Sequence, residues 1–335
     1  MVKKVCALLL VLCLALGVVT TVASAEGKKI KVGYDIYYLG NSWSVQMYEE
    51  FKYAVSNTQD DIEVIYVDSQ GDADKQVANL EDLVAQQVDV IITTPWSSSA
   101  PIPVLREARD AGIKVVLLAS TVDTKDYDCL VTCDETEFGR AGAQWLADQL
   151  GGKGNIICLN GISGLSTSEL RWQGAQEVFA KYPDIKVLAS PDAKWDYAEA
   201  KVVVADLLAT YPQIDGVWSQ GGAMTLGAIE SFQAANRPLV PMTGEDNNGY
   251  LKKWKELQSQ GMKGIACAKP TWLAEVALQK AIALVKGEAV EQDVIYPTAV
   301  FSDDELDTYV RTDLPDDFWA NTHLPDDVIK TIFAQ

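Results

Sequence analysis

The chain has 335 residues, 48% of them hydrophobic, and its 47 acidic and 28 basic residues give a formal net charge of −19. This length is sufficient for two domains, each with its own hydrophobic core. The strong negative charge excludes nucleic acid and anionic membrane surfaces as principal partners, because those surfaces attract basic proteins.

Residues 1–25 have the pattern of a secretory signal. Two lysines precede an apolar run that ends in Ala23-Ser24-Ala25, a small-residue pattern typical of signal-peptidase cleavage. A membrane anchor lipidated at Cys13 is the alternative, but Leu12 is too large for the position before a lipidated cysteine. No later segment approaches the length of a membrane span. We therefore expect a mature protein that is periplasmic or otherwise secreted.

After the signal, the chain alternates short β-branched runs with amphipathic segments. A strand is predicted at 31–37 and a helix at 44–56, and residues 87–120 then form a strand, a helix over 98–111 and a second strand. The strands at 88–94 and 113–119 are almost continuously apolar, which is typical of parallel sheets covered on both faces. In such sheets, ligands bind beyond the carboxyl ends of the strands.

The chain contains an internal repeat. Residues 61–96 and 184–222 each have a strand, a polar turn, an amphipathic helix and a second strand that opens with Val-Asp or Ile-Asp. Each copy is preceded by a further strand and helix. The repeat predicts an α/β protein with two similar doubly wound parallel-sheet lobes, in which the loops after the strands face the other lobe.

Four cysteines remain after the signal is removed. Cys129 and Cys133 lie in one predicted strand, about 13 Å apart, which is too far for a disulfide. We expect apolar packing near a sheet, with a Cys133–Cys267 disulfide as the alternative. The cysteine spacing does not indicate a metal site.

From residue 28 to about 300 the sequence resembles the type I, ribose-binding-like periplasmic sugar-binding proteins of ABC transporters. The motifs that carry the resemblance, in this order and spacing, are Val67-Asp68-Ser69-Gln70, Val88-Asp89, Thr94-Pro95, Ala111-Gly112-Ile113, Arg171 with Gly174, Ala223-Met224, Leu226-Gly227-Ala228 and Gly244-Glu245-Asp246.

The resemblance implies a hinge that the chain crosses three times, near Cys133, Cys267 and Val300. It divides the chain into an N-terminal lobe (26–133 plus 267–300) and a C-terminal lobe (134–266 plus 301–335). The segment 301–335 extends past the usual end of the family. We expect it to form a surface strap packed by its aromatic residues, with a partner-docking tail as the alternative.

A sugar site needs aromatic rings against the C–H faces and polar groups for the hydroxyls. The resemblance and the strand ends indicate Trp43, Trp96 and Trp195 as stacking residues, although each is also compatible with core packing. Trp145, Trp172, Trp218 and Trp254 are expected in the core. The polar candidates are Asn41, Ser120, Glu169, Arg171, Gln220, Glu245, Asp246 and Lys269. Arg171 is alternatively structural, pairing across the second lobe.

The polar set departs from the family. The resemblance implies an Asp-Arg pair at Ala119-Ser120, an Arg at Glu169, Asn-Asp at Gly221-Gly222 and a hinge Gln at Ala268, and none of these is present. A cleft without these arginines lacks the guanidinium groups that bind a carboxylate or phosphate through two hydrogen bonds, so it is poorly suited to such ligands. We expect a neutral or weakly cationic ligand: a sugar, polyol or furanose, or alternatively a nucleoside or an amine bound by cation–π contact.

The sequence disfavours catalysis. No Gly-x-Gly-x-x-Gly follows the first strand, and the only histidine, His323, lies in the tail. We predict a monomeric, non-enzymatic binding protein without cofactor or metal, which delivers its ligand to an ABC permease by hinge closure. A ligand sensor that feeds a chemoreceptor or a histidine kinase is the alternative function.

Overall fold

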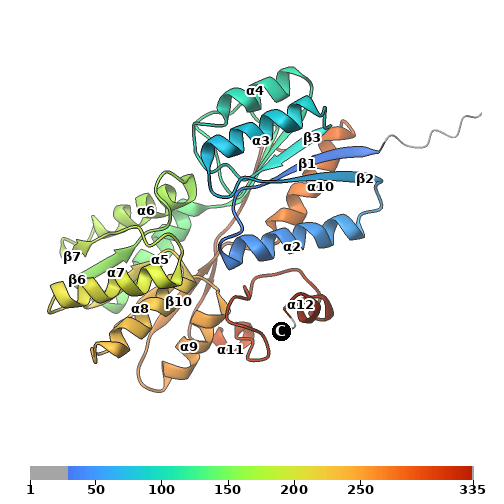
Figure 1. Cartoon of the computed structure of the whole chain (residues 1–335). Coiled ribbons are helices and arrows are strands. Elements are labelled where there is room, and N and C mark those ends of the chain that lie inside the picture. Colours follow the sequence, from blue (N-terminus) through green and yellow to red (C-terminus); the bar gives the residue numbers. More distant parts are fainter. Residues whose placement is uncertain (1–28, 334–335) are drawn as a thin grey trace, which may run out of the picture.

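The computed structural model describes residues 29–333, so the predicted signal lies outside the described residues. The chain forms two α/β lobes, each built on a six-stranded sheet with helices on both faces (Figure 1). The strand orders are β11-β5-β4-β3-β1-β2 in the N-terminal lobe and β12-β10-β9-β8-β6-β7 in the C-terminal lobe. The two orders correspond position by position, which confirms the predicted pair of similar lobes.

The N-terminal lobe contains six strands and four helices of the described chain. They are β1 (Ile30–Ile36), α2 (Ser42–Asn57), β2 (Ile62–Asp68), α3 (Ala73–Ala85), β3 (Val90–Thr93), α4 (Ile102–Asp110), β4 (Lys114–Leu118), β5 (Cys129–Cys133), α10 (Leu273–Val285) and β11 (Asp293–Tyr296). The expected helix at 98–111 is shorter at its start, because Pro101 occupies the N-cap position. Gly112, with φ +86°, follows its end, where a residue without Cβ adopts this conformation most readily.

The C-terminal lobe repeats this pattern, and the tail adds two short helices. Its elements are α5 (Glu135–Gln149), β6 (Lys153–Leu159), α6 (Ser166–Phe179), β7 (Asp184–Ala189), α7 (Tyr197–Thr210), β8 (Gly216–Ser219), α8 (Gly222–Ala234), β9 (Met242–Gly244), α9 (Asn248–Gln258), β10 (Gly264–Ala268) and β12 (Ala299–Phe301), followed by α11 (Leu306–Tyr309) and α12 (Asp326–Ile332). The two sequence repeats are β2-α3-β3 and β7-α7-β8.

All strand pairs are parallel except β10 with β12, which is antiparallel. In each sheet the chain reverses its direction of winding at the first strand, β1 or β6, so that β1 lies between β2 and β3, and β6 between β7 and β8. The crevice beyond the carboxyl ends of such strands is the usual ligand position in open α/β sheets.

The chain crosses between the two sheets three times. The crossings follow β5, β10 and β11. β10 extends to Ala268, so the second crossing lies after Cys267, and β12 already belongs to the C-terminal sheet, so the third lies before Val300. Hydrogen bonds join the first crossing to the third: Asp134 N–H donates to Tyr296 O (2.9 Å), and Thr298 Oγ1 donates to Asp134 O (2.8 Å).

Both sheets are covered by hydrophobic clusters on each face. Trp218 and Trp254 are fully buried, and Trp145 and Trp172 pack against the core of the C-terminal lobe, as predicted. All four described cysteines are buried free thiols. The alternative of a Cys133–Cys267 disulfide is therefore wrong; the Cys133 thiol instead lies 3.6 Å from Glu135 Oε1.

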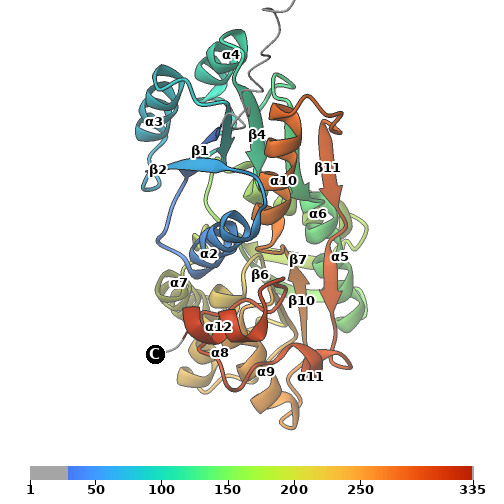
Figure 2. The same ribbon diagram turned by 90° about the vertical axis from the view of Figure 1, so that its right-hand side faces the viewer.

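The tail contacts both lobes. It runs from β12 past α9 and then along α2 of the N-terminal lobe, ending in α12 (Figure 2). It carries a small core of its own, formed by Leu314, Phe318, Leu324 and Ile329, against which Tyr53 of α2 packs. The assignment of 301–335 to the C-terminal lobe alone is therefore incomplete, because the side chains that face the tail come from both lobes.

Candidate functional site

A cavity of about 190 Å³ lies between the lobes, beyond the carboxyl ends of the strands. A single water needs only roughly 10–15 Å³ on the same measure, so the cavity has room for a small organic molecule. It is lined by Tyr37, Gly40, Asn41, Ser42, Trp43, Ser120, Leu165, Thr167, Arg171, Trp195, Asp196, Tyr197, Ala223, Glu245, Lys269 and Trp319. These residues come from both lobes and from the tail.

Three tryptophans line the cavity, and the N–H group of each indole is bonded to the protein. Trp43 Nε1 donates to Lys269 O (2.8 Å), Trp195 Nε1 to Gln220 O (3.2 Å) and Trp319 Nε1 to Ser42 Oγ (3.0 Å). The polar atom of each ring is thus already satisfied, and the carbon surface is what remains for a ligand. Such surfaces suit the C–H faces of a sugar or polyol.

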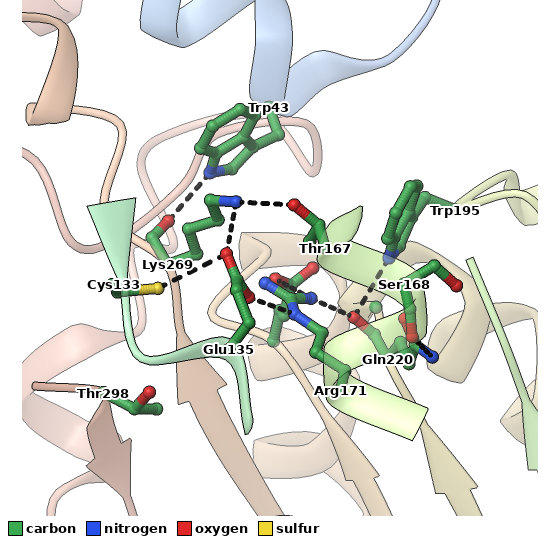
Figure 3. A network of polar contacts seen from close by, with 12 residues as sticks. Trp43, Cys133, Glu135, Thr167, Ser168, Arg171, Trp195, Gln220, Lys269 and Thr298 are labelled. Carbon is green, nitrogen blue, oxygen red and sulfur yellow. Dashed lines mark hydrogen bonds and ion pairs between the residues drawn. The ribbon is translucent and has the colours of Figure 1, made fainter. Parts of the chain in front are cut away.

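Behind the rings lies a buried charge network of Arg171, Glu135, Glu245 and Lys269 (Figure 3). Arg171 lies 2.7 Å from both carboxylates, through Nε to Glu135 and through Nη1 to Glu245. The Lys269 ammonium pairs with the other oxygen of Glu135. The network contains two cations and two carboxylates, and each charged group has a partner of opposite sign.

Burial and pairing act in opposite directions on these groups. Burial raises the pKa of Glu135, but the attraction of Lys269 and Arg171 outweighs this effect and leaves the pKa below its ordinary value. For Glu245, burial dominates and its pKa is raised, with Arg171 offsetting only part of the effect. The single paired cation of Glu245, against two for Glu135, explains the difference.

Lys269 holds the two lobes against each other at the cavity. Its Nζ also donates to Ala119 O (2.6 Å) after β4 and to Thr167 Oγ1 (3.1 Å) on α6. Together with Glu135, these acceptors use all three N–H groups of the ammonium. Ala119 adopts the left-handed conformation (φ +65°), which is uncommon outside glycine. The predicted ligand residue Lys269 therefore lines the cavity but has its donors committed to the protein.

Two neighbouring contacts close the same edge. Ser120 Oγ lies 3.2 Å from Thr167 Oγ1, and Thr121 N–H donates to Ser166 Oγ (3.0 Å). Both join the end of β4 in the N-terminal lobe to the start of α6 in the C-terminal lobe. The structure thus shows the two lobes in direct contact beside the cavity.

The structure brings seven of the eleven predicted ligand residues to the cavity wall: Asn41, Trp43, Ser120, Arg171, Trp195, Glu245 and Lys269. The structural alternative for Arg171 also holds geometrically, because it is almost completely buried and joins α5, α6 and the end of β9. Asn41 is the N-cap of α2, where its Oδ1 accepts from Ser44 N–H (2.9 Å).

Two predicted residues lie away from the cavity. Trp96 packs behind the lining residue Tyr37 and against Tyr38, with ring centroids 5.9 and 5.7 Å apart. Glu169 is exposed and accepts a hydrogen bond from Gly164 N–H (3.1 Å) instead. Trp96 lies in the loop after β3, and Glu169 lies in the first turn of α6, which points its side chain to solvent.

Gln220 and Asp246 are buried just behind the wall. Gln220 O accepts from Arg171 and Trp195, and Gln220 Nε2 donates to Asn160 Oδ1 (3.0 Å). Asp246 Oδ2 accepts from Asn321 N–H of the tail (2.6 Å). Burial raises the pKa of Asp246 to about 7, and the charge of Glu245 acts in the same direction. Both residues position the wall and the tail.

Several lining residues were not among the predicted ligand residues. Tyr37, Thr167, Asp196 and Tyr197 flank predicted strand ends or helix starts, a signal that was available. Glu135 follows the first hinge crossing, and nothing in its sequence context indicates that it pairs with Arg171. Trp319 lies in the tail, for which the repeat gives no position.

Gly221, which stands where the resemblance implies a larger residue, lies against the Trp195 ring. A Cβ atom there would lie 2.7 Å from Trp195 Cδ1, and one at Gly161 would lie 2.2 Å from Trp195 Cζ2. The two glycines therefore make room for the Trp195 ring and not for a larger ligand.

Two similar lobes, a three-crossing hinge and a cavity lined from both sides define a two-lobed solute-binding protein. Residues 32–289 match the family described as periplasmic binding protein domain. The chain belongs to the periplasmic binding protein family, and its resemblance to type I sugar-binding members is confirmed.

Individual relatives agree with this assignment. The xylitol-binding protein of Mycolicibacterium smegmatis is 32% identical over 298 residues, covering 89% of this chain and 83% of the relative. A ribose import binding protein of Bacillus subtilis is 24% identical, covering 82% and 88%. A Mycobacterium smegmatis structure in complex with β-D-fucofuranose has a TM-score of 0.76 at 26% identity, covering 83% and 93%.

Between residues 29 and 333, no helix combines the length and apolar character needed to cross a membrane. In the same part of the chain, no group of three or more His, Cys, Asp or Glu side chains is arranged to hold a metal ion.

Proposed function

We propose that this protein is an extracytoplasmic solute-binding protein that captures a small neutral sugar or polyol between its lobes and delivers it to an ABC permease by hinge closure. The observation that carries the proposal is the pairing of every charge in the buried network, beside three indole rings whose N–H groups are bonded to the protein. A neutral, hydroxyl-bearing molecule fits such a surface.

The relatives support the same ligand class. The proteins compared above are described as binding xylitol, importing ribose, or holding β-D-fucofuranose. A polyol, a pentose and a furanose share a carbon skeleton of similar size with several hydroxyl groups. We propose that the ligand of this chain belongs to the same group, and that the protein acts as a periplasmic monomer without enzymatic activity, cofactor or metal.

The amine alternative is less well supported. An amine would need a carboxylate free to neutralise it. The two carboxylates of the buried network, Glu135 and Glu245, already pair with cations, and Asp246 lies behind the wall, where it accepts from Asn321 N–H of the tail. Asp196 lines the cavity but is exposed and caps α7 through Glu199 N–H (2.7 Å). A nucleoside remains compatible with the aromatic rings and serves as a competing ligand in the test.

A thermal-shift screen tests the ligand class. The chain from Glu26 is mixed with xylitol, D-ribose, other pentoses, hexoses and inositols, and separately with nucleosides and small amines. At a hundred times its dissociation constant, a ligand adds about 2.7 kcal/mol to the free energy of unfolding, which raises the melting temperature by several degrees. A rise with sugars or polyols is expected.

Calorimetry then measures the affinity of each hit. If only nucleosides or amines raise the melting temperature, the sugar or polyol proposal is refuted. Transport is distinguished from sensing by adding the loaded protein to vesicles that hold a sugar ABC permease with its ATPase, where ligand-dependent ATP hydrolysis is expected.

A further inference from the structure

Residues 314–324, here called the strap, lie outside the 32–289 range that matches the family, yet they reach the ligand cavity. Toward the C-terminal lobe, the strap is held by three main-chain bonds and by the side chains of Asn248, Lys252 and Asp246. Asn248 N–H donates to Phe318 O (2.8 Å), Gly249 N–H to Asp316 O (2.9 Å), and Ala320 N–H to Asp246 O (3.1 Å). These bonds fix the strap along the start of α9.

Toward the N-terminal lobe, the same strap is held mainly by side chains of α2. The Gln46 amide bonds both main-chain groups of Trp319: Oε1 accepts from its N–H (2.8 Å) and Nε2 donates to its carbonyl (3.0 Å). The Trp319 indole donates to Ser42 Oγ, and Thr322 Oγ1 donates to Glu50 Oε1 (2.6 Å). Gln46, Glu50 and Trp319 are all at most 5% exposed.

The loop before α10 completes the attachment to the N-terminal lobe. Trp272 Nε1 donates to Asn321 Oδ1 (3.1 Å), and the His323 ring stacks on the Trp272 ring, with centroids 4.5 Å apart and planes at 3°. Asn321 also donates its main-chain N–H to Asp246 of the opposite lobe (2.6 Å). A single residue of the strap thus bonds both lobes.

This alternation has a mechanical consequence. The strap contacts the N-terminal lobe through Trp319 and Thr322 and the C-terminal lobe through Ala320 and Asn321. If the lobes separate at this edge, one set of contacts must break. The set toward α2 consists of side-chain bonds alone, whereas the C-terminal lobe adds three main-chain bonds to the side-chain bonds of Asn248, Lys252 and Asp246. Detachment from α2 is therefore the easier step.

We propose that the strap is a latch between the two lobes, which releases α2 when the protein opens, and that its Trp319 is a ligand-binding residue. Trp319 and its partner Ser42 both line the cavity, so the latch and the ligand share a wall. Closure is then stabilised in part by contacts of the protein with itself. The latch goes beyond the proposed function and does not depend on which molecule binds; the role of Trp319 rests on that function.

The latch is tested by small-angle X-ray scattering without added sugar. The chain from Glu26 is compared with the double variant Ser42→Ala/Gln46→Ala, which removes three bonds from α2 to Trp319. The variant is expected to have a larger radius of gyration than the wild type, whose scattering should match the closed structure. Lys330→Ala, an exposed α12 variant that loses only an ion pair with Asp326, is the matched control.

Two results overturn the latch: equal radii of gyration for the wild type and the double variant, or an open wild type. If the double variant fails to fold, Thr322→Val with Ser42→Ala replaces it, since Gln46 is then intact; the same larger radius is expected, and an unchanged radius again contradicts the latch.

The role of Trp319 has a separate readout. With a sugar or polyol that stabilises the wild type, Trp319→Leu is expected to lose at least tenfold in affinity, while Lys330→Ala keeps it; equal affinities would overturn the role. If no compound of the panel binds the wild type, the proposed function and the role of Trp319 fail together, and scattering still decides the latch.

Discussion

The Nζ atom of Lys269 lies 2.6 Å from the main-chain oxygen of Ala119, so a lysine at the second hinge crossing contacts the end of β4 in the opposite lobe. The same ammonium pairs with the buried carboxylate of Glu135. Stability and closure are therefore coupled at one side chain.

We expect Lys269→Met to lower the free energy of unfolding by roughly 3 kcal/mol, because removing one partner of a buried ion pair leaves the other charge less well compensated. Arg171 still pairs with Glu135, which limits the loss. Urea unfolding measures the effect. The double variant Lys269→Met/Glu135→Gln is the control and should recover part of the loss; a single variant as stable as the wild type would contradict the assigned role.

The stacking role of the tryptophans predicts a contrast between variants. Trp43→Leu and Trp195→Leu should each weaken binding of a panel sugar or polyol at least tenfold, which corresponds to about 1.4 kcal/mol, because each ring lines the cavity. Trp96→Leu is the matched control, since Trp96 lies behind Tyr37. Isothermal titration calorimetry measures all three. Equal losses for Trp96 and Trp195 would show that the cavity wall has been misassigned.

Asp246 predicts a pH dependence of stability. Its pKa is raised from 3.8 to about 7 in the folded protein, so between these values the folded state binds more protons than the unfolded state. Stability therefore falls as the pH rises from about 4 to about 7, by up to about 4 kcal/mol from this group.

Asp246→Asn should make the stability less dependent on pH over this range, because the amide does not ionise. Urea unfolding at the two ends of the range, for the variant and the wild type, measures the difference. Asp35 and Glu50 are also buried with raised pKa values. The wild type and the variant therefore both keep the part of the pH dependence of stability that comes from these two groups. Identical slopes for the two proteins would rule out a raised pKa at Asp246.

The free cysteines predict slow thiol chemistry. Burial raises the pKa of the Cys129 thiol to about 11 and that of Cys133 further, and thiolates are the reactive form. The folded chain from Glu26 should not react with a thiol reagent within minutes. In denaturant, four thiol groups per chain should react, one for each cysteine. Two equivalents in denaturant would reveal a disulfide.

Much of the fold was predictable because it depends on local patterns. The apolar runs that became β3 and β4, the glycine at 112 that ends a helix, and the repeat over 61–96 and 184–222 all report burial and backbone conformation, which neighbouring residues determine. The order of strands then follows from the winding of the repeat. The strand ends, together with the family resemblance, placed Asn41, Trp43, Ser120 and Trp195 near the cavity.

Other features depend on contacts between distant residues. Arg171 and Lys269 line the cavity, but Glu135 pairs with both of them and Glu245 pairs with Arg171. The sequence separation of these residues gives no sign of this pairing. Trp96 and Glu169 do not line the cavity, because the loop after β3 packs Trp96 behind Tyr37 and the start of α6 turns Glu169 to solvent. Trp319 reaches the cavity because α2 and α9 hold the strap on opposite sides. Thus the sequence by itself determined the lobes, the cleft and its aromatic character, which arise from local patterns along the chain. The tertiary structure decided which charges are neutralised and which rings form the wall, because those depend on how the two lobes and the tail meet.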